Sequence, residues 1–473
     1  MTGYSDISMI AHLLRRAGFG GNREDLEYYT DKGYEATVEE LLNPESQPEY
    51  EDDLAFRYVP YYRMGTGAPS FQCYWMYRMI STRRPLEEKM TLFWHHIFAT
   101  SHSKLNRNPQ MNKQLQLLRS FALGNFRTVL IQISKDPAMI YWLDNCENHN
   151  GAPNENYGRE LLELFSMGVG MDNEINYSEE DVKECARAFT GWTMAPQLPR
   201  YPYGDYCWDF EYRSDDHDDG EKVFLGEKGR FNGDDIVDII IRQPSTARFL
   251  ARHLYNFFVS DEPQVPSWQT TDPQDVEAIK ILEQEYFRSN GDIRSMLRVL
   301  FNSEFFKNSL YKKVKSPAEL IAGVMRLVDD YTSPKPNSHE IAFAAGYMGQ
   351  DLLNPPTVEG WHTGKEWIDS GALVERVNFA ADRIGDVSMP GVQRIIERLI
   401  AYGPVIESGK FLDLCLDLVG PVEVSEDRRS ELMTYLDKQG PIKCSTSDEK
   451  QIFEKVTTGL LRLIVASREF QFA

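Results

Sequence analysis

Apolar residues recur every three to four positions along most of this chain. This period is typical of amphipathic helices, which turn one apolar face towards a protein core. Gly18 and Gly20 end the first such segment, and Pro85 suits the first turn of another. The pattern predicts helices at residues 9–16, 85–98, 110–123, 154–165, 178–192, 234–241, 245–258, 274–288, 293–301, 317–329, 374–381, 392–401 and 450–470.

Alternation of apolar and polar residues, which is typical of strands, is almost absent. Residues 206–212 alternate roughly, and residues 222–226 could pair with them across an Asp-Gly turn. Strand patterns do not alternate with helix patterns, so neither a Rossmann fold nor a barrel is expected. The sequence therefore predicts a mainly α fold: a large multi-helix globular body with one small β-hairpin insertion.

The length of 473 residues exceeds the usual size of a single hydrophobic core. The stretch 332–338 carries the strongest linker signal, and residues 403–427 are less regular than their surroundings. We expect residues 1–330 to form a helical main body that carries the polar motifs. Residues 331–473 are expected to form a helical C-terminal part that packs on this body and is not independent of it.

Composition restricts the partners. The net charge of −21 disfavours nucleic acid and anionic membranes. The six cysteines are widely spaced and include no CxxC pair, which argues against a zinc ribbon or a thioredoxin-type site. The sequence shows no signal peptide and no membrane-spanning run. We expect a cytoplasmic protein without membrane insertion, while export stays open because a chain that had lost its leader would look the same.

The densest charged motif lies in residues 154–165. On a helical wheel Glu155, Arg159, Glu160 and Glu163 share one polar arc, and Arg159 can pair with Glu155 four residues earlier. A solvated face of an amphipathic helix explains this arc. The alternative is a site where Glu155 and Glu160 act as acid–base groups and Arg159 balances their charge.

The next predicted helix begins with Ser178-Glu179-Glu180-Asp181, which is similar to a capping box. Arg187 lies off its apolar stripe, and Trp192 follows its end. Arg187 is either solvated or pairs with the carboxylates of the preceding helix.

Two adjacent histidines, His95 and His96, lie in a helix that is apolar nearly all round. Buried polar groups need partners, so a structural role with a hydrogen-bond partner is one interpretation. The other is a metal ligand or general base. Neighbouring residues point about 100° apart on a helix, so the two rarely bind one metal together.

His217 lies in an acidic turn, residues 215–222. The turn is only partly similar to a calcium loop, because His217 replaces an oxygen ligand and Gly226 stands where a glutamate is required, so an EF-hand is rejected. The turn is either solvated, or His217 and its carboxylates contribute to a metal or acid–base site. Arg248 and Arg252 share a helix face and would attract an anionic ligand or the protein's own carboxylates.

Several common motifs are missing from the sequence. It contains no GxSxG, no P-loop, no HExxH and no GxGxxG after a strand. The usual esterase, nucleotide-binding and zincin classes therefore lose support.

A series of short motifs, in this order, resembles an uncharacterised bacterial family, the domain-of-unknown-function family numbered 1800. The motifs are HLLRRAGFG at 12–20, FWH at 93–95 with FAT at 98–100, NEN at 154–156 with REL at 159–161, ARAFTGW at 186–192, HD at 217–218 with Lys222 and LG at 225–226, Pro244 with AR at 247–248, and PP at 355–356 with GW at 360–361. The resemblance extends to about Asn378 and implies a mainly helical fold but no established reaction.

The resemblance also raises expectations about partners. Many relatives carry a second histidine where this chain has Ile97, and many are exported. Relatives are often encoded beside members of a sulfatase-like uncharacterised family. This association implies a protein partner from that family or a shared carbohydrate-related pathway, by analogy only.

Two hypotheses from different classes follow. The first is an enzyme with a polar pocket in a helical body, hydrolytic or acid–base, with a divalent metal as candidate cofactor. Its candidate residues are Glu155, Glu160, His95 and Arg159 for catalysis, Arg187, Arg248, Lys222 and Trp192 for substrate binding, and His217 and His96 for metal. The second is a non-catalytic binding or assembly protein in which these residues form a structural ion-pair network. Convergence on an open pocket favours the enzyme, and complete pairing favours the network.

Overall fold

The computed structural model describes residues 6–59, 68–171, 173–195, 208–331, 333–335 and 339–473. Helices dominate this part of the chain, and its strands form four antiparallel pairs of two or three residues per strand. The mainly α fold predicted from the sequence is confirmed. The linker signal at 332–338 lies mostly outside the described residues.

The first half of the chain supplies the helices around the polar motifs. They are α1 (Asp6–Arg16), α2 (Arg23–Lys32), α3 (Tyr34–Leu42), α4 (Asp52–Tyr58), α6 (Ala68–Ser81), α7 (Pro85–Ile97), α8 (His102–Leu105), α9 (Asn108–Ser120), α10 (Phe126–Ser134), α11 (Pro137–Trp142), α12 (Asn156–Glu163), α13 (Glu179–Ala188) and α14 (Gly233–Ile240).

The second half of the chain begins with helix α15 (Pro244–Phe258). The helices that follow are α16 (Val276–Ser289), α17 (Ile293–Asn302), α18 (Glu304–Lys307), α19 (Pro317–Val328), α20 (His339–Tyr347), α21 (Ser370–Ile384), α22 (Pro390–Tyr402), α23 (Ser408–Leu418), α24 (Glu426–Asp437), α25 (Ser447–Val465) and α26 (Arg468–Gln471). The stretch 403–427, expected to be irregular, contains α23, and the predicted helix 450–470 is divided into α25 and α26.

Local capping sets several helix starts. The Ser178 side chain accepts a hydrogen bond from the backbone N–H of Asp181 at 3.2 Å, and the Asp181 carboxylate accepts from the backbone of Ser178 at 2.8 Å, which confirms the predicted capping box. Ser316 and Glu319 form the same arrangement at the start of α19. This cap places the Glu319 carboxylate inside the protein, where it is 8% exposed.

The strand pairing differs from the predicted hairpin. Strand β4 (Phe210–Tyr212) pairs with β3 (Trp192–Met194), and β5 (Lys222–Phe224) pairs with β6 (Glu227–Gly229). The expected pairing of 206–212 with 222–226 is therefore wrong, and 206–207 lie outside the described residues. The reason is local: Leu225 and Gly226 adopt positive φ and form the two-residue turn from β5 to β6. The two other pairs are β1 (Gly170–Met171) with β2 (Glu174–Ile175), and β7 (Val405–Ile406) with β8 (Ile442–Lys443).

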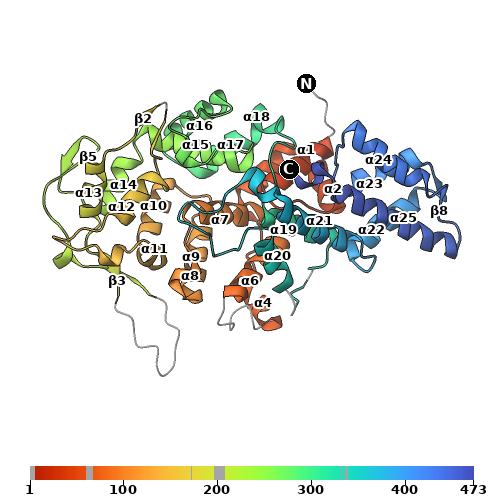
Figure 1. Ribbon diagram of the computed structural model, residues 1–473, viewed down its shortest axis with the longest axis horizontal. Coiled ribbons are helices and arrows are strands. Elements are labelled where there is room, and N and C mark those ends of the chain that lie inside the picture. The colour runs from red at the N-terminus through yellow and green to blue at the C-terminus, as the bar shows by residue number, and fades with distance from the viewer. Residues whose placement is uncertain (1–5, 60–67, 172, 196–207, 332, 336–338) are drawn as a thin grey trace.

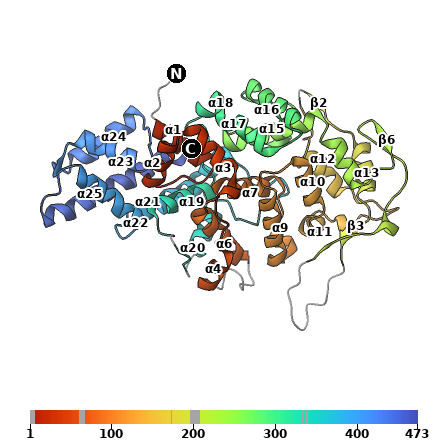
Figure 2. The same ribbon diagram turned by 180° about the vertical axis from the view of Figure 1, so that it is seen from behind.

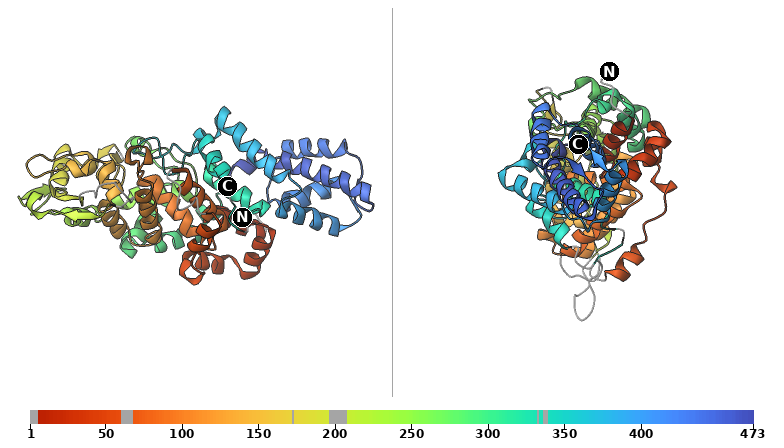
Figure 3. Two further views of the ribbon diagram at one scale, coloured as in Figure 1. Left: turned by 90° about the horizontal axis from the view of Figure 1, so that it is seen from below. Right: turned by 90° about the vertical axis from the view of Figure 1, so that its right-hand side faces the viewer.

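The molecule is elongated (Figure 1). Helices α10 to α14 form one end, α22 to α25 form the other, and α1, α7 and α19 lie between them, as the view from behind also shows (Figure 2). Figure 3 adds the view from below and the compact outline seen along the long axis. The C-terminus returns to the middle, where the backbone N–H of Ala473 donates to the carbonyl oxygen of Lys313 at 2.9 Å.

Two large clusters of buried apolar side chains form the core. The first uses residues between Ile10 and Phe306, and the second uses residues between Phe19 and Phe470. Helix α6 belongs to the second cluster and packs against α19 and α20. Helices on both sides of residue 331 thus share one core, and the division into 1–330 and 331–473 stays a prediction.

The described helices include none that is both long enough and apolar enough to cross a membrane.

Candidate functional site

The polar face of α12 divides into a paired part and an unpaired part. Arg159 donates to Glu155 at 3.2 Å, as the four-residue spacing predicted, and to both carboxylate oxygens of Glu179 on α13 at 2.7 and 2.8 Å. Glu179 is exposed, Arg159 and Glu155 are partly exposed, and the ion pairs raise the pKa of Arg159. The pair with Glu179 links α12 to α13, and exposed ion pairs of this kind contribute little to stability.

Glu160, the next residue, is half-buried and unpaired. Its carboxyl group makes no hydrogen bond or ion pair with any residue in the described ranges. Burial raises the pKa of Glu160 to about 7, and the negative charges of Glu163 and Glu359 add to this rise, while Arg159 opposes it. A buried carboxyl group without a partner prefers the neutral form, because low-dielectric surroundings penalise its charge.

Arg187 lies at the centre of a separate network, which we call the Arg187 network. It donates to Glu184 at 2.8 Å on its own helix and to Asp218 at 2.7 Å in the acidic turn. Lys222, 1% exposed, donates to the backbone carbonyl oxygens of Asp218 and of Gly220. Arg187 does not contact the carboxylates of α12, which the sequence had offered as partners.

His217 and Trp192 belong to the same network. Nδ1 of His217, which is buried, lies 2.9 Å from the carbonyl oxygen of Thr190, and Trp192 Nε1 donates to Asn232 at 2.8 Å. Gly191 has a φ of 78°, and a Cβ there would lie 2.4 Å from the carbonyl oxygen of Arg213, so only glycine fits. The network thus ties the acidic turn to the end of α13 with its polar groups paired.

Arg248 lies elsewhere, on α15. It donates to Glu283 of α16 at 2.8 Å, in agreement with the internal salt bridge offered as one interpretation. The pair borders a hollow of about 310 Å³, which Arg252, Trp268 and Lys280 also line. The guanidinium group of Arg252 lies 4.5 Å from the ring centre of Trp268.

His95 points into an aromatic environment. It is 1% exposed, its ring meets the rings of Trp75 and Trp361 edge-on, and its Nε2 makes no hydrogen bond within the described chain. Burial lowers the pKa of His95 to about 3, and His96 lowers it further. The residue is therefore neutral at pH 7.

The loop of residues 357–361 packs closely against His96. Gly360, with a φ of 86°, approaches so closely that a Cβ there would lie 2.5 Å from the His96 carbonyl oxygen and 3.1 Å from its Nδ1. Trp361 stacks on the His96 ring at 6.4 Å between ring centres, with the planes 11° apart. Burial lowers the pKa of His96 to about 4, and the charge of Lys313 contributes. Glu359, which raises the pKa of Glu160, precedes Gly360 in this loop.

A small cavity lies beside His96. Its volume is about 20 Å³, enough for one water molecule. His253 of α15 faces the same cavity with an Nε2 that makes no hydrogen bond within the described residues, and burial followed by the charge of His96 lowers the pKa of His253. The other polar lining residues are Asn256, Lys313, Ser316, Glu319, Gln350 and Thr363.

We call the meeting place of α7, α12, α15 and the 357–361 loop the junction. The Phe98 ring at the end of α7 packs on Phe165 after α12, with 5.5 Å between ring centres. Of the residues proposed from sequence, Glu160, His95 and His96 lie at the junction. The paired remainder lies on the α12 surface (Glu155, Arg159), in the Arg187 network (Arg187, Lys222, Trp192, His217) and at the α15–α16 hollow (Arg248).

Sequence reasoning missed three residues of the junction. His253 follows Arg252 in a stretch that was selected only for its arginines, and Gly360 appeared only as part of a GW motif. Glu359 carried no signal of its own. His253 could have been found as a histidine on an apolar helix face, and Gly360 as a glycine beside a tryptophan.

Candidate metal ligands are not gathered in this structure. In the part of the chain that is described, no three or more His, Cys, Asp or Glu side chains are arranged to hold a metal ion. His96 contacts the 357–361 loop and His217 contacts Thr190, so the two predicted metal ligands have different surroundings.

A family model described as a protein of unknown function, DUF1800, matches residues 12–472. The chain belongs to this family. The DUF1800 match therefore includes both the junction and the Arg187 network. No curated protein and no solved structure matches this chain.

Proposed function

We propose that this DUF1800 protein is an acid–base enzyme in which Glu160 exchanges a proton with a bound substrate. The observation that carries the proposal is the pKa of about 7 of an unpaired, half-buried carboxyl group. Such a group exists in both protonation states near neutral pH, which is what general acid–base catalysis requires. Buried polar groups with a purely structural role are normally hydrogen-bonded.

The neighbouring charges favour hydrolysis of a neutral substrate. Glu163 and Glu359 are the two carboxyl groups whose charge raises the pKa of Glu160, and Glu163 also accepts from the Tyr177 hydroxyl at 3.4 Å. Negative charge around Glu160 disfavours anionic substrates. A protonated carboxyl group beside a second carboxylate is the pair that glycoside hydrolysis uses, so neutral glycosides are the first class to test.

His96 and His253 would serve as substrate-orienting groups. Both have lowered pKa values and are neutral at pH 7, and a neutral imidazole offers one donor and one acceptor. The Nε2 of His253 makes no hydrogen bond with the described residues, so it is available to a water molecule or a single hydroxyl group in the cavity of about 20 Å³ beside His96.

The residues of the Arg187 network fit the alternative hypothesis, in which polar residues form a structural ion-pair network. Arg187, Lys222 and His217 hydrogen bond to neighbouring side chains or carbonyl groups. This pairing supports a structural role in fixing the acidic turn. A non-catalytic assembly function for the whole protein would require the junction to be equally paired, which Glu160 is not.

A hydrolysis assay across pH tests the proposal. Purified protein is incubated with neutral p-nitrophenyl glycosides and esters between about pH 5 and 9. The expected result is turnover whose rate changes around pH 7, because Glu160 changes its protonation state there. Turnover that is constant between about pH 6 and 8 would exclude Glu160 as the proton-exchanging group.

A further inference from the structure

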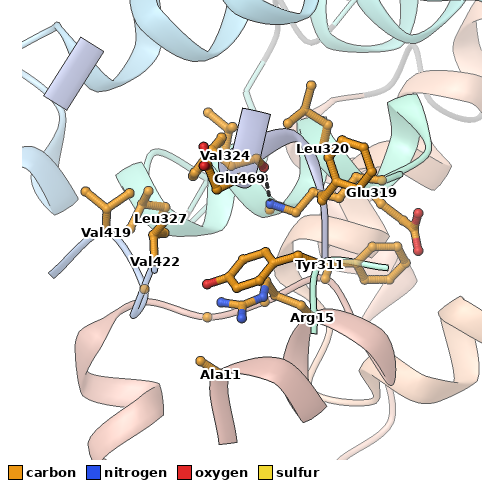
Figure 4. A pocket seen from close by; sticks show the side chains of 18 of the residues that line it. Ala11, Arg15, Tyr311, Glu319, Leu320, Val324, Leu327, Val419, Val422 and Glu469 are labelled. Atoms are coloured by element: carbon orange, nitrogen blue, oxygen red, sulfur yellow. Dashed lines mark hydrogen bonds between the residues drawn. The ribbon is translucent and has the colours of Figure 1, made fainter. Parts of the chain in front are cut away.

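A second cavity lies in the middle of the molecule, and Glu319 lines both this cavity and the one beside His96. Figure 4 shows it between α1, which contributes Ala11 and Arg15, and α19, which contributes Leu320 and Val324. Its volume is about 60 Å³, less than half of the about 150 Å³ that holds a benzene molecule in an engineered protein. Tyr311 and Lys315 precede α19 and complete one wall.

Two cations, Arg15 and Lys315, and two carboxylates, Glu319 and Glu469, line this cavity. Six cationic side chains interact electrostatically in this region, and they are Arg15, Arg16, Lys89, Lys313, Lys315 and Arg376. Two of them are neutralised, because Lys89 pairs with Glu319 and Lys313 pairs with Asp261 at 2.9 Å. Of the other four, Arg16 and Arg376 are buried, whereas Arg15 and Lys315, which line the cavity, are partly exposed.

The remaining four cations have only neutral partners or none. Arg16 donates to the carbonyl oxygen of Val259 at 2.6 Å, Lys315 to that of Phe470 at 2.6 Å, and Arg376 to Gln471 and the Lys315 carbonyl oxygen at 2.9 and 2.8 Å. Nε of Arg16 and Nη1 of Arg376 are buried without a hydrogen bond in the described structure. Burial lowers the pKa values of Arg16, Lys315 and Arg376, and the charge of Glu319 opposes this only in part. An added anion near these groups would therefore stabilise their charged forms.

Arg15 is the cation best placed to bind that anion. Its guanidinium group lines the cavity and makes no hydrogen bond or ion pair within the described ranges. Glu469 also lines the cavity, but it accepts from the backbone N–H of Ser425 at 3.3 Å and forms no ion pair with a described residue. Gly420 leaves room here, because a Cβ on it would lie 4.0 Å from Nη1 of Arg15.

The opposite wall is mainly apolar, although Glu319 at the start of α19 also lines the cavity. The apolar part of this wall consists of Leu320, Val324 and Leu327 of α19 together with Val419 and Val422. A guanidinium group binds a carboxylate through two parallel hydrogen bonds, and an aliphatic wall suits an alkyl group. An inorganic oxyanion would leave polar oxygens against this wall, which is unfavourable.

We propose that this cavity binds a short aliphatic carboxylate, which accepts hydrogen bonds from Arg15 and Lys315 and packs its alkyl group on the α19 wall. The site is independent of the proposed acid–base function at Glu160. The apolar wall selects the length of the alkyl group, and the two cations select the carboxylate.

Calorimetric titration of the full-length protein with propanoate tests the proposal. The probes are propanoate, its neutral analogue propanamide and inorganic phosphate. The expected result is saturable binding of propanoate with a Kd below about 10 mM, and at least about tenfold weaker binding of propanamide and of phosphate. The absence of propanoate binding, or phosphate binding that is equally tight and depends on Arg15, would overturn the proposal.

Two variants locate the binding. Arg15→Gln removes the charge and should weaken propanoate binding by at least about tenfold. Ala11→Leu fills the cavity and should have the same effect while leaving both cations in place, and circular dichroism checks that each variant folds. The control is Arg428→Gln, which changes an exposed arginine that pairs with Glu431 on α24 and should leave binding unchanged. Unchanged propanoate binding in either folded cavity variant would place the ligand elsewhere and refute the assignment.

Discussion

Glu160→Gln lowers the rate of substrate hydrolysis by a factor of about 10² to 10⁴. Glutamine has almost the same shape as glutamic acid but cannot exchange a proton near pH 7. The loss should therefore appear in kcat, and the change of rate around pH 7 should disappear with it. Initial rates measured at saturating substrate between about pH 5 and 9 check both outcomes.

The matched control for this prediction is Glu180→Gln. Glu180 lies on the surface of α13, where it forms a 3.4 Å ion pair with Lys183, and its replacement should leave kcat and the pH profile intact. If Glu160→Gln retains more than about a tenth of the wild-type kcat, Glu160 is not the proton-exchanging group.

Glu88→Gln is expected to destabilise the protein by about 3–5 kcal/mol. Glu88 has no exposed surface and accepts from Arg78 at 2.9 Å, from Arg119 at 2.6 and 3.1 Å, and from Trp75 Nε1 at 3.0 Å. The two arginines lower the pKa of Glu88 to about 2 against the effect of burial. Glutamine would leave the partly exposed Arg119 without an ion-pair partner among the described residues, and the buried Arg78 with only Asp52. Urea unfolding followed by circular dichroism measures the loss.

The pH dependence of stability provides a second test at Glu88. Its pKa in the folded protein lies below the unfolded value of about 4.3, so its stabilisation is fully present above that value and is lost as the pH falls towards 2. The neighbouring change Glu87→Gln serves as control, because Glu87 pairs only weakly with Arg84, at 3.8 Å, and should cost less than about 1 kcal/mol. Equal losses for the two variants would contradict the structural role given to Glu88.

Much of the helical architecture was predictable because its causes are local. The spacing of apolar residues, the capping residues and the prolines each act within one or two helical turns. Helices α7, α15 and α19 were therefore located from the sequence to within a few residues. The strand pairs were not, because pairing depends on which segments the helices bring together. Trp192 meets Tyr212 across a long connection, whereas the sequence suggested only the nearer partner.

The candidate site was only partly predictable for the same reason. The sequence singled out Glu160 as an acid–base group, but its raised pKa results mainly from burial and in part from Glu359, which is almost two hundred positions away and carried no signal. Arg187 was expected either in water or against α12, and it pairs instead with Glu184 and Asp218. The residue types in a motif do not show which charged side chains form ion pairs. That depends on residues that are distant in sequence and come close only in the folded protein.

The titration of Glu160 itself is the most direct test of the proposed acid–base site. The ¹³Cδ chemical shift of its side chain, assigned through its absence from the Glu160→Gln variant, is followed as a function of pH in glutamate-labelled protein. The predicted result is a midpoint of about 7, caused by burial and by the charges of Glu163 and Glu359. A midpoint near the ordinary value of 4.5 would contradict the proposed role of Glu160.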